Sequence, residues 1–508
     1  MNPSAGKQIE FNSAVVQSFF HFVKNTEEIV CHYIDANGKE GRTIKSTLKL
    51  SPARGDYKIY QNYDGSLNLK DFFLQILHLT AEKNSNDFFA LRKRSENHYD
   101  LFYLPASLTI PELYNILSLK NKEILFPIHI KPLGENNNTS FRPYITAIKS
   151  KPFLLLAGIS GTGKSRIVRE LARACWDEGS EEYKSQKPRN FEMVQVKPNW
   201  HDSSELIGYV SRIDGVHYVV GPFLKFMVKA MQDPETPYFL CLDEMNLAPV
   251  EQYFAEYLSV IESRKCQEDG TIVTDPIIDY SNTEEYKSLI DQLFADNDDL
   301  RREYLTEDGG KRLSIPQNLI VVGTVNMDET TFSFSRKVLD RAMTIEMNEV
   351  DLEGGLDARH EKIGKLGRAE LIGTAVEGVD VYHAYQTVCD KVIAYLKAVN
   401  EQLEGTPFKI AYRTRNEFLL YAVNNLPYKK EGETQEDVVR RALDEITSMK
   451  ILSRIEGDAD KIGTLLERLT RAVKEQLGEQ FTTENSVSLK KLAEMEKRLK
   501  SGYTSFWS

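Results

Sequence analysis

The sequence predicts an α/β fold for the middle of the chain, preceded by a small α+β domain and followed by helices. From about residue 143 to residue 350, short apolar segments alternate with helical patterns, as in a parallel sheet with covered faces. A glycine-rich loop follows the first of these segments, and heptad-like apolar spacing dominates from about residue 380 onward. We therefore predict an α+β domain over 1–140, an α/β nucleotide-binding domain over 143–350 and a helical region over 351–508.

Two hairpin signals define the predicted N-terminal domain. Alternating apolar segments flank Asn37-Gly38 in one case and Ser95-Glu96-Asn97 in the other. Helical patterns lie between and after the hairpins, and a polar stretch that begins at Pro132 is typical of a linker. The predicted strands are 29–33, 43–50, 88–92 and 99–104, and the predicted helices are 69–80 and 110–119.

Short apolar segments predict the strands of the α/β domain, because strands covered on both faces read as continuous apolar runs. An acidic, tyrosine-rich stretch at 266–314 interrupts this pattern and contains a helical segment at 283–295, so we interpret it as an insertion at the sheet's rim. The predicted strands are 153–157, 191–196, 238–242 and 319–323, and the predicted C-terminal helices are 382–404, 415–423, 434–450, 460–476 and 488–500.

The composition is that of an ordinary globular protein, with 41% apolar and 27% charged residues in a chain of 508. No stretch approaches the roughly 20 apolar residues that a membrane-spanning helix needs, and the N-terminus lacks the pattern of a secretory signal. The five cysteines are scattered without a C-x-x-C pair, which argues against a structural zinc site. We therefore expect a cytoplasmic protein that does not bind membranes.

The net charge of −11 is unevenly distributed along the chain. Residues 1–150 carry 18 Lys and Arg against 15 Asp and Glu, whereas the remainder carries 46 against 60. A weakly basic N-terminal part permits contact with nucleic acid without demanding it. An ordinary solvated surface explains the same distribution.

A glycine-rich loop at 158–165 indicates the ligand. Its sequence, Gly-Ile-Ser-Gly-Thr-Gly-Lys-Ser, fits the pattern G-x-x-x-x-G-K-[ST] between a strand and a helix. Glycines let the backbone wrap a phosphate, Lys164 reaches the β- and γ-phosphates, and the Ser165 hydroxyl is a predicted Mg²⁺ ligand. We expect a nucleoside triphosphate with Mg²⁺ to be bound through Gly158, Ser160, Gly161, Thr162, Gly163, Lys164 and Ser165.

Two acids, Asp243 and Glu244, end the apolar segment 238–242. Asp243 is predicted to hold Mg²⁺ directly or through water, and Glu244 to orient and deprotonate the attacking water. Alternatively, the two acids begin the next helix and interact with its dipole. The phosphate loop about 80 residues earlier favours the first interpretation.

Asn326 lies at the C-terminal tip of the predicted strand 319–323. Ligands of open α/β sheets bind just beyond the strand ends, so Asn326 is predicted to hydrogen-bond the attacking water or the γ-phosphate. A turn-capping asparagine is the alternative. Asp328 and Glu329 follow, and we expect them to orient Asn326 or an arginine of a neighbouring subunit.

Arginines that follow the last predicted strand are candidates to stabilise the charge that develops on the γ-phosphate. Arg341 is the candidate arginine finger, acting across a subunit boundary, with Arg336 as the second choice. A surface ion pair between Arg341 and Asp340 is the alternative. Arg413 and Arg415 open a later helix; one of them is a candidate nucleotide contact, and a solvated helix start is the alternative.

Five motifs in order resemble the AAA+ module of McrB-type NTPases, the motor subunits of modification-dependent restriction systems. The resemblance covers about 143–480 and extends to Tyr412-Arg413, where this family's lid arginine is expected. The motifs are 158–165 (GISGTGKS), 198–204 (PNWHDSS), 242–248 (LDEMNLA), 323–331 (GTVNMDETT) and 338–342 (VLDRA).

The resemblance implies an AAA+ P-loop NTPase core with a C-terminal helical lid. It implies a ring, usually hexameric, that hydrolyses nucleotide at subunit boundaries, recruits a separate McrC-type nuclease and selects DNA through a variable N-terminal domain. The best-known members read Met-Asn-Thr-Ala-Asp-Arg-Ser at one strand tip, whereas 325–330 contains no arginine, so ATP and GTP both stay open. The family roles are assigned to Lys164, Ser165, Asp243, Glu244 and Asn326.

Two functions fit this chemistry. The first is an McrB-like motor for DNA restriction or anti-phage defence, which needs a separate nuclease because the chain shows no P-D…E-x-K or H-N-H pattern. The second is a MoxR-like chaperone that remodels a protein partner or inserts a metal cofactor.

The N-terminal domain distinguishes these two functions. A DNA reader is expected to bind through Arg92, Lys93 and Arg94 with an affinity that falls steeply with salt. A solvated turn is the alternative for this triplet, and a sensor of a phage protein is a third hypothesis for the domain.

Overall fold

The computed structural model divides the chain into two compact units, the first within Met1–Pro127 and the second formed by Ile128–Gln267 with Thr271–Ser508. The structure describes residues 10–11, 26–34, 40–51, 56–60, 72, 88–95, 98–104 and 140–507, the last with gaps at 268–269, 279–283, 306–310, 328–331, 350–351, 353–359 and 361. The linker expected from Pro132 onward and the two predicted N-terminal helices lie outside the described residues, apart from Ser140 and Phe72.

The first unit contains a six-stranded sheet in the order β1-β4-β3-β2-β6-β5. Strands β2 and β3 form one antiparallel hairpin and β5 and β6 form another, and β2 pairs with β6 in parallel. The four strands predicted from alternation are therefore present. The strands are β1 Glu10–Phe11, β2 Thr26–Ile34, β3 Glu40–Ser51, β4 Asp56–Tyr60, β5 Phe88–Ser95 and β6 His98–Leu104.

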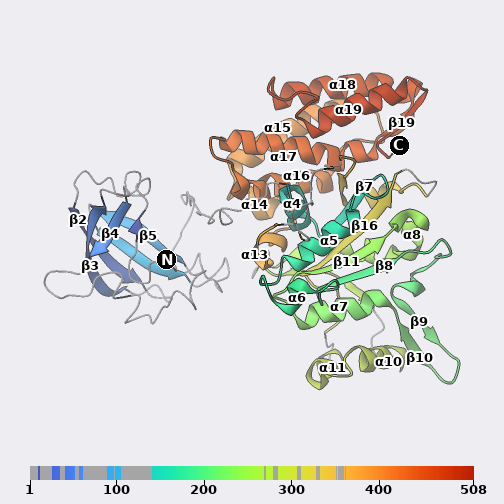
Figure 1. Cartoon of the computed structure of the whole chain (residues 1–508), viewed down its shortest axis with the longest axis horizontal. Coiled ribbons are helices and arrows are strands. Elements are labelled where there is room, and N and C mark those ends of the chain that lie inside the picture. Colours follow the sequence, from blue (N-terminus) through green and yellow to red (C-terminus); the bar gives the residue numbers. More distant parts are fainter. Residues whose placement is uncertain are drawn as a thin grey trace. The chain divides into compact units, whose positions relative to one another are not determined.

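The second unit is built on a five-stranded, fully parallel sheet in the order β17-β7-β16-β11-β8 (Figure 1). The four predicted strands form, and the edge strand β17 was not predicted because its four residues are too few to stand out as an apolar run. The strands are β7 Phe153–Gly158, β8 Phe191–Gln195, β11 Tyr238–Asp243, β16 Leu319–Asn326 and β17 Met343–Glu346.

Both faces of this sheet are covered, which explains the continuous apolar character of its strands. Successive residues of β7 point to opposite sides, so Leu154 and Leu156 join one hydrophobic cluster while Phe153 and Leu155 join another. The helices around the sheet are α4 Arg142–Ser150, α5 Lys164–Arg173, α6 Glu181–Lys184, α7 Pro222–Gln232, α8 Val250–Tyr253, α9 Ala255–Val260 and α12 Arg336–Leu339.

The stretch predicted as an insertion, 266–314, contains short strands and two helices, α10 Glu284–Leu293 and α11 Asp298–Leu305. Helix α10 coincides with the predicted helical segment at 283–295 and packs on the hairpin of β9 Gly208–Ser211 and β10 His217–Val220. There Gln292 donates from Nε2 to the carbonyl of Tyr218 at 2.7 Å. The short strands of this stretch are β12 Lys265–Cys266, β13 Ile272–Val273, β14 Pro276–Ile278 and β15 Leu313–Ser314.

The C-terminal region is helical, as predicted, and its helices pack together (orange to red in Figure 1). Buried polar contacts tie it to the α/β core: Arg142 of α4 donates to Oε2 of Glu445 at 2.8 Å. Within the described residues, every helix is too short or too polar to cross a bilayer. The helices are α13 Arg368–Leu371, α14 Gly378–Tyr382, α15 Gln386–Gln402, α16 Tyr412–Asn425, α17 Gln435–Lys450, α18 Ala459–Leu477 and α19 Val487–Leu499, with the strand pair β18 Glu456–Asp458 and β19 Tyr503–Ser505.

Candidate nucleotide site

The predicted phosphate loop connects β7 to α5 and has the backbone conformation that its glycines permit. Gly161 and Gly163 have φ of 84° and 82°, in the left-handed region. A Cβ at either position would meet nothing within 4 Å, so conformation rather than space requires glycine there. Gly158 differs, because a Cβ would lie 2.6 Å from the carbonyl oxygen of Met347. Ser160 is exposed and Thr162 half-buried in the same loop.

Lys164 opens α5 and folds back over this loop. Its side chain is buried, and Nζ donates to the carbonyls of Gly158 at 3.0 Å and Ile159 at 2.7 Å. A second side chain, Asn348, accepts from the Ile159 amide at 3.0 Å. Sequence reasoning missed Asn348 because it follows β17, which pairs with β7 only in the folded sheet. The loop thus combines an ammonium group with helix-terminal N–H groups, the chemistry that binds phosphate.

The strand-tip acids lie beside the loop, as predicted. Ser165 donates from Oγ to Oδ1 of Asp243 at 2.7 Å. Mg²⁺ takes oxygen ligands and is usually held by one or two carboxylates together with substrate phosphates and water. A serine hydroxyl in contact with a single carboxylate fits that requirement. No cluster of three or more His, Cys, Asp or Glu side chains is found among the described residues.

Thr324 joins the two acids and is a residue that the sequence analysis missed. Its hydroxyl donates to Oδ1 of Asp243 at 2.8 Å and accepts from the Glu244 amide at 2.9 Å. The pairing of Leu242 with Gly323 in β11 and β16 places Thr324 level with Asp243. One hydroxyl therefore sets the positions of both acids relative to each other.

Glu244 has an unusual backbone conformation, with φ of 55° and ψ of 50°. Left-handed non-glycine residues are uncommon and concentrate at functional sites. Asn326 donates from Nδ2 to Oε1 of Glu244 at 3.3 Å. The structure thus brings Asn326 to the acid itself, which suits a residue that orients the carboxylate. Asp328 and Glu329, predicted to assist Asn326, lie outside the described residues.

The candidate arginine finger lies beside the N-terminal ends of the parallel strands, which we call the N-terminal edge of the sheet. The phosphate loop lies at the C-terminal ends, the C-terminal edge. Arg341 precedes β17, where Met343 pairs with Leu154 near the start of β7, whereas the phosphate loop follows the end of β7. Four residues of strand separate these levels by roughly 13 Å. Arg341 donates from Nε to the carbonyl of Leu258 at 2.8 Å, and burial lowers its pKa. The alternative partner, Asp340, instead pairs with Arg454 at 3.2 Å.

Arg413 lies with Arg341 and not with the phosphate loop. Both arginines approach Glu262, which follows α9: Arg413 forms an ion pair with it, and Arg341 Nε lies 3.7 Å from its Oε1. Glu262 in turn lies 3.8 Å from Nζ of Lys151, just before β7. The structure therefore does not support the expected contact of Arg413 with the nucleotide of its own chain.

The remaining candidate arginines are held by aromatic rings. The Arg336 guanidinium lies 5.0 Å from the ring centre of Phe408, and that of Arg415 lies 5.0 Å from the ring centre of Tyr412. Cation–π contacts at exposed sites are weak, so they orient these side chains without fixing them. Arg336, the second-choice finger, is exposed, and Arg341 is partly buried, so each is held by a contact within its own chain.

In the N-terminal unit, only part of the basic triplet is described. Arg94 donates to Oε2 of Glu40 at 2.9 Å and forms an ion pair with Asp100. The side chains of Arg92 and Lys93 lie outside the described residues. Because its partners are two carboxylates of the same sheet, Arg94 is better explained as an internal ion pair than as a DNA contact.

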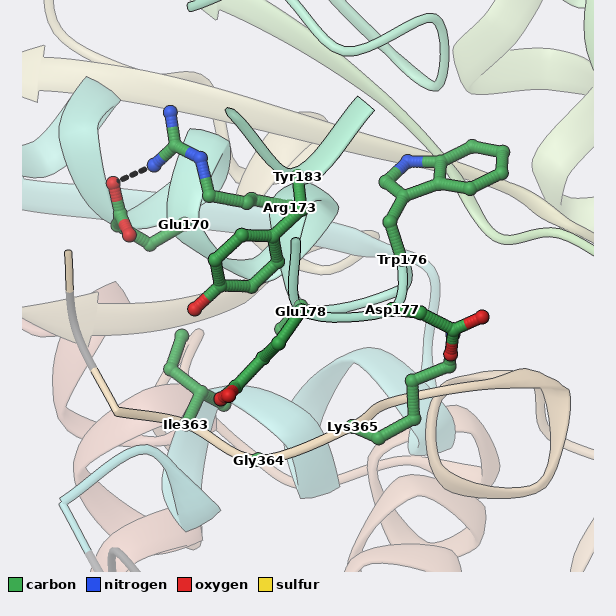
Figure 2. Close-up of a pocket in the computed structure, with 10 residues that line it drawn as sticks. Glu170, Arg173, Trp176, Asp177, Glu178, Tyr183, Ile363, Gly364 and Lys365 are labelled. Carbon is green, nitrogen blue, oxygen red and sulfur yellow. Dashed lines mark hydrogen bonds and ion pairs between the residues drawn. The ribbon is translucent and has the colours of Figure 1, made fainter. Parts of the chain in front are cut away.

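A small cavity of about 170 Å³ lies at the other end of α5, apart from the phosphate loop (Figure 2). Arg173, Trp176 and Lys365 are among its lining residues, and Lys365 is paired with Asp177 at 2.7 Å. It shares no residue with the loop or the acids, so it is not the nucleotide site.

Comparison with known proteins agrees with this geometry. Residues 153–279 match the AAA domain of the dynein-related subfamily. The core is an AAA+ domain. Residues 372–503 match a domain of unknown function, DUF8727, which covers most of the C-terminal helices. The predicted AAA+ core with its C-terminal helices is therefore confirmed.

The chain is also similar to the Type IV methyl-directed restriction enzyme EcoKMcrB subunit of Escherichia coli K12, with 23% identity over 261 residues. That alignment covers 51% of this chain and 47% of the relative, so each protein is matched over about half its length. The resemblance of the AAA+ chain to McrB-type NTPases is thereby confirmed. A crystal structure from Cytophaga hutchinsonii, provisionally described as an ATPase, aligns with 66% of this chain and 89% of its own at a TM-score of 0.34 and 16% identity.

Proposed function

We propose that this AAA+ NTPase is an McrB-like motor that assembles into a ring, hydrolyses ATP or GTP with Mg²⁺, and drives DNA restriction or anti-phage defence with a separate McrC-like nuclease. One observation carries the hydrolytic part: a hydrogen-bonded chain runs from Ser165 through Asp243 and Thr324 to Glu244. It ends on Asn326. This arrangement presents a Mg²⁺ ligand pair and an oriented carboxylate at the phosphate loop.

Each residue of this site has a role in the proposed reaction. Lys164 and the loop amides bind the β- and γ-phosphates. Ser165 and Asp243 hold Mg²⁺, which when bound supplies charge neutralisation on the phosphates. Glu244, held by Asn326, takes the proton of the attacking water and orients it in line with the γ-phosphate. Lys164 must leave its carbonyl partners to reach the phosphate, an exchange that its flexible stem permits.

Arg341 completes the site of a neighbouring subunit in this proposal. It lies at the opposite sheet edge from its own phosphate loop, so it serves another chain more readily than its own. A head-to-tail ring brings that edge against the next subunit's loop. The shared position of Arg413 near Glu262 supports its action at the same boundary.

The test uses two inactive variants of the full-length protein. Arg341→Ala and Lys164→Ala are each expected to lose turnover of ATP and GTP, measured as phosphate release with Mg²⁺. When they are mixed before assembly, some boundaries combine an intact loop with an intact arginine, and turnover should return. Absence of any rescue would remove Arg341 from action across the boundary.

The biological part of the proposal rests on the similarity to EcoKMcrB and on the weakly basic N-terminal residues. The expected result is salt-sensitive DNA binding by the full chain and nucleotide-dependent DNA cleavage when an McrC-like nuclease is added. DNA binding and cleavage that both fail, with remodelling of a protein client instead, would favour the MoxR-like alternative. All five cysteines are free thiols, which supports the proposed cytoplasmic location.

A further inference from the structure

Lys450, the last residue of α17, carries its ammonium group in a fully buried position. Its Nζ donates to the carbonyls of Leu339, Asp340 and Ala342 at 3.1, 3.0 and 2.8 Å. These residues surround Arg341 in the sequence. The lysine therefore holds the backbone on both sides of the arginine that we propose as the finger.

The turn that Lys450 holds follows a very short helix. Helix α12 is a single turn, and the last carbonyls of a helix lack partners within the helix. A positive charge at that end is favoured by the partial negative charge of these carbonyl oxygens. Burial disfavours the charged form and lowers the pKa of Lys450 to about 8, while Glu417 opposes this shift.

The same ammonium group is linked to the lid and to the start of the phosphate-loop strand. Glu417 of α16 pairs through Oε2 with Lys450 at 2.9 Å and through Oε1 with Lys151 at 2.6 Å. Lys151 lies directly before β7. A second tie joins Arg454 to Asp340. The turn at Arg341 is thus connected directly to α17 through Lys450 and, by way of Glu417, to α16.

We propose that Lys450 is a positioning residue that couples the helical lid to Arg341, so that the placement of the lid sets the reach of this arginine toward the neighbouring nucleotide. This inference rests on the proposed action of Arg341 across a subunit boundary. The Lys450 ammonium group has all three of its protons directed at carbonyls of the turn, and moving it away would leave a buried charge without partners. Movement of α17 is therefore transmitted to the turn at 339–342 rather than absorbed.

A matched control lies on the same helix. Asp444 is also buried, but its carboxylate accepts from the amides of Val487 and Ser488 at 2.9 and 3.0 Å, at the start of α19. It holds two lid helices together and does not contact the turn at 339–342. Asp444→Asn therefore perturbs the lid without releasing Arg341.

The experiment measures nucleotide turnover of Lys450→Met and of its mixture with Lys164→Ala. We expect Lys450→Met to lower kcat by about 10- to 100-fold with little change in the nucleotide dissociation constant, because a misplaced finger weakens only the transition state. Mixing should restore turnover, since the Lys164→Ala subunits supply a correctly held Arg341. Asp444→Asn, with a comparable loss of melting temperature, should keep its kcat.

The Arg341→Ala and Lys164→Ala mixture is the reference for these outcomes. Rescue in the reference without rescue of Lys450→Met would overturn the positioning role and leave the proposed function intact. Failure of both mixtures would overturn action across the boundary and the inference with it. If Lys450→Met does not fold, Arg454→Gln, which removes the second tie to Asp340, must show a smaller loss of kcat with the same rescue.

Discussion

The two edges of the parallel sheet carry polar clusters of opposite kinds. At the C-terminal edge, Asp243, Glu244 and Asn326 are half-buried and joined by single hydrogen bonds. At the N-terminal edge, Lys450 and Glu417 are buried and joined by an ion pair. Half-buried hydrogen bonds can be exchanged for water or ligand at little cost, whereas a buried ion pair resists separation. The first cluster can exchange its partners for ligand or water during a reaction, whereas the second holds the backbone around it in one position.

The largest effect is expected at the C-terminal edge from Lys164→Ala. Removal of the ammonium group deletes the countercharge of the phosphates, so binding of ATP and GTP should fall below detection and turnover should stop. Binding is measured by equilibrium titration with a fluorescent nucleotide in the presence of Mg²⁺. Retained binding with normal affinity would show that the loop does not hold the phosphates.

Glu244→Gln separates chemistry from binding at the same edge. The amide keeps the shape but cannot accept a proton, so kcat should fall by about 10²- to 10⁴-fold while the nucleotide still binds and keeps the proposed ring assembled. Phosphate release and sedimentation velocity report the two effects. Turnover at the wild-type rate in this variant would exclude Glu244 as the base.

Thr324→Val tests whether one hydroxyl sets both acids. Its loss should lower kcat by about 10- to 100-fold, as for partners that orient groups directly bound to a metal or substrate. The control is Thr344→Val in β17, because Thr344 is buried in the same sheet and its hydroxyl has no hydrogen-bond partner. Thr344→Val should keep full activity, and equal losses in the two variants would reduce Thr324 to a packing role.

Glu262→Gln addresses the arginine edge and is expected to have a smaller effect. Oε1 of Glu262 makes no hydrogen bond and lies at ion-pair distance from Arg341, so for Arg341 the neutral amide removes attraction rather than a hydrogen bond, while it also neutralises the ion-pair partner of Arg413. A loss of kcat of roughly threefold to fivefold should follow, with unchanged nucleotide affinity. A weakened affinity instead would indicate that Arg413 serves the nucleotide of its own chain.

The smallest effect concerns pH and stability at the buried edge. Burial lowers the pKa of Lys450 to about 8, below the usual value of 10.5 in an unfolded chain. Between these values the unfolded state binds more protons, so this group makes the folded state more stable as pH rises from about 8. The difference in melting temperature between wild type and Lys450→Met should shift in favour of wild type between pH 7.5 and 9.5. A difference that is constant across this range would contradict the lowered pKa.

Local patterns predicted the phosphate loop and the acids, because each lies within a few residues of a strand end. Asn326 was found in the same way, although its contact is with Glu244. Thr324 was missed, since a threonine within an apolar strand gives no signal until the pairing of β11 and β16 places it beside Asp243. Arg413 was predicted from the family pattern, and its partner Glu262 belongs to a distant segment.

The sequence alone predicted a nucleoside triphosphate as the ligand, because glycines, a lysine and strand-end acids occur within short, contiguous segments. The sequence did not predict that the two edges of the sheet carry different kinds of polar cluster. This difference depends on the strand order β17-β7-β16-β11-β8. It also depends on C-terminal helices whose side chains contact core residues more than 100 positions earlier, as Lys450 contacts Ala342. Burial then turns ordinary-looking residues such as Lys450 and Glu417 into strongly paired charges, because the energy of a charge depends on its surroundings rather than on its neighbours in sequence.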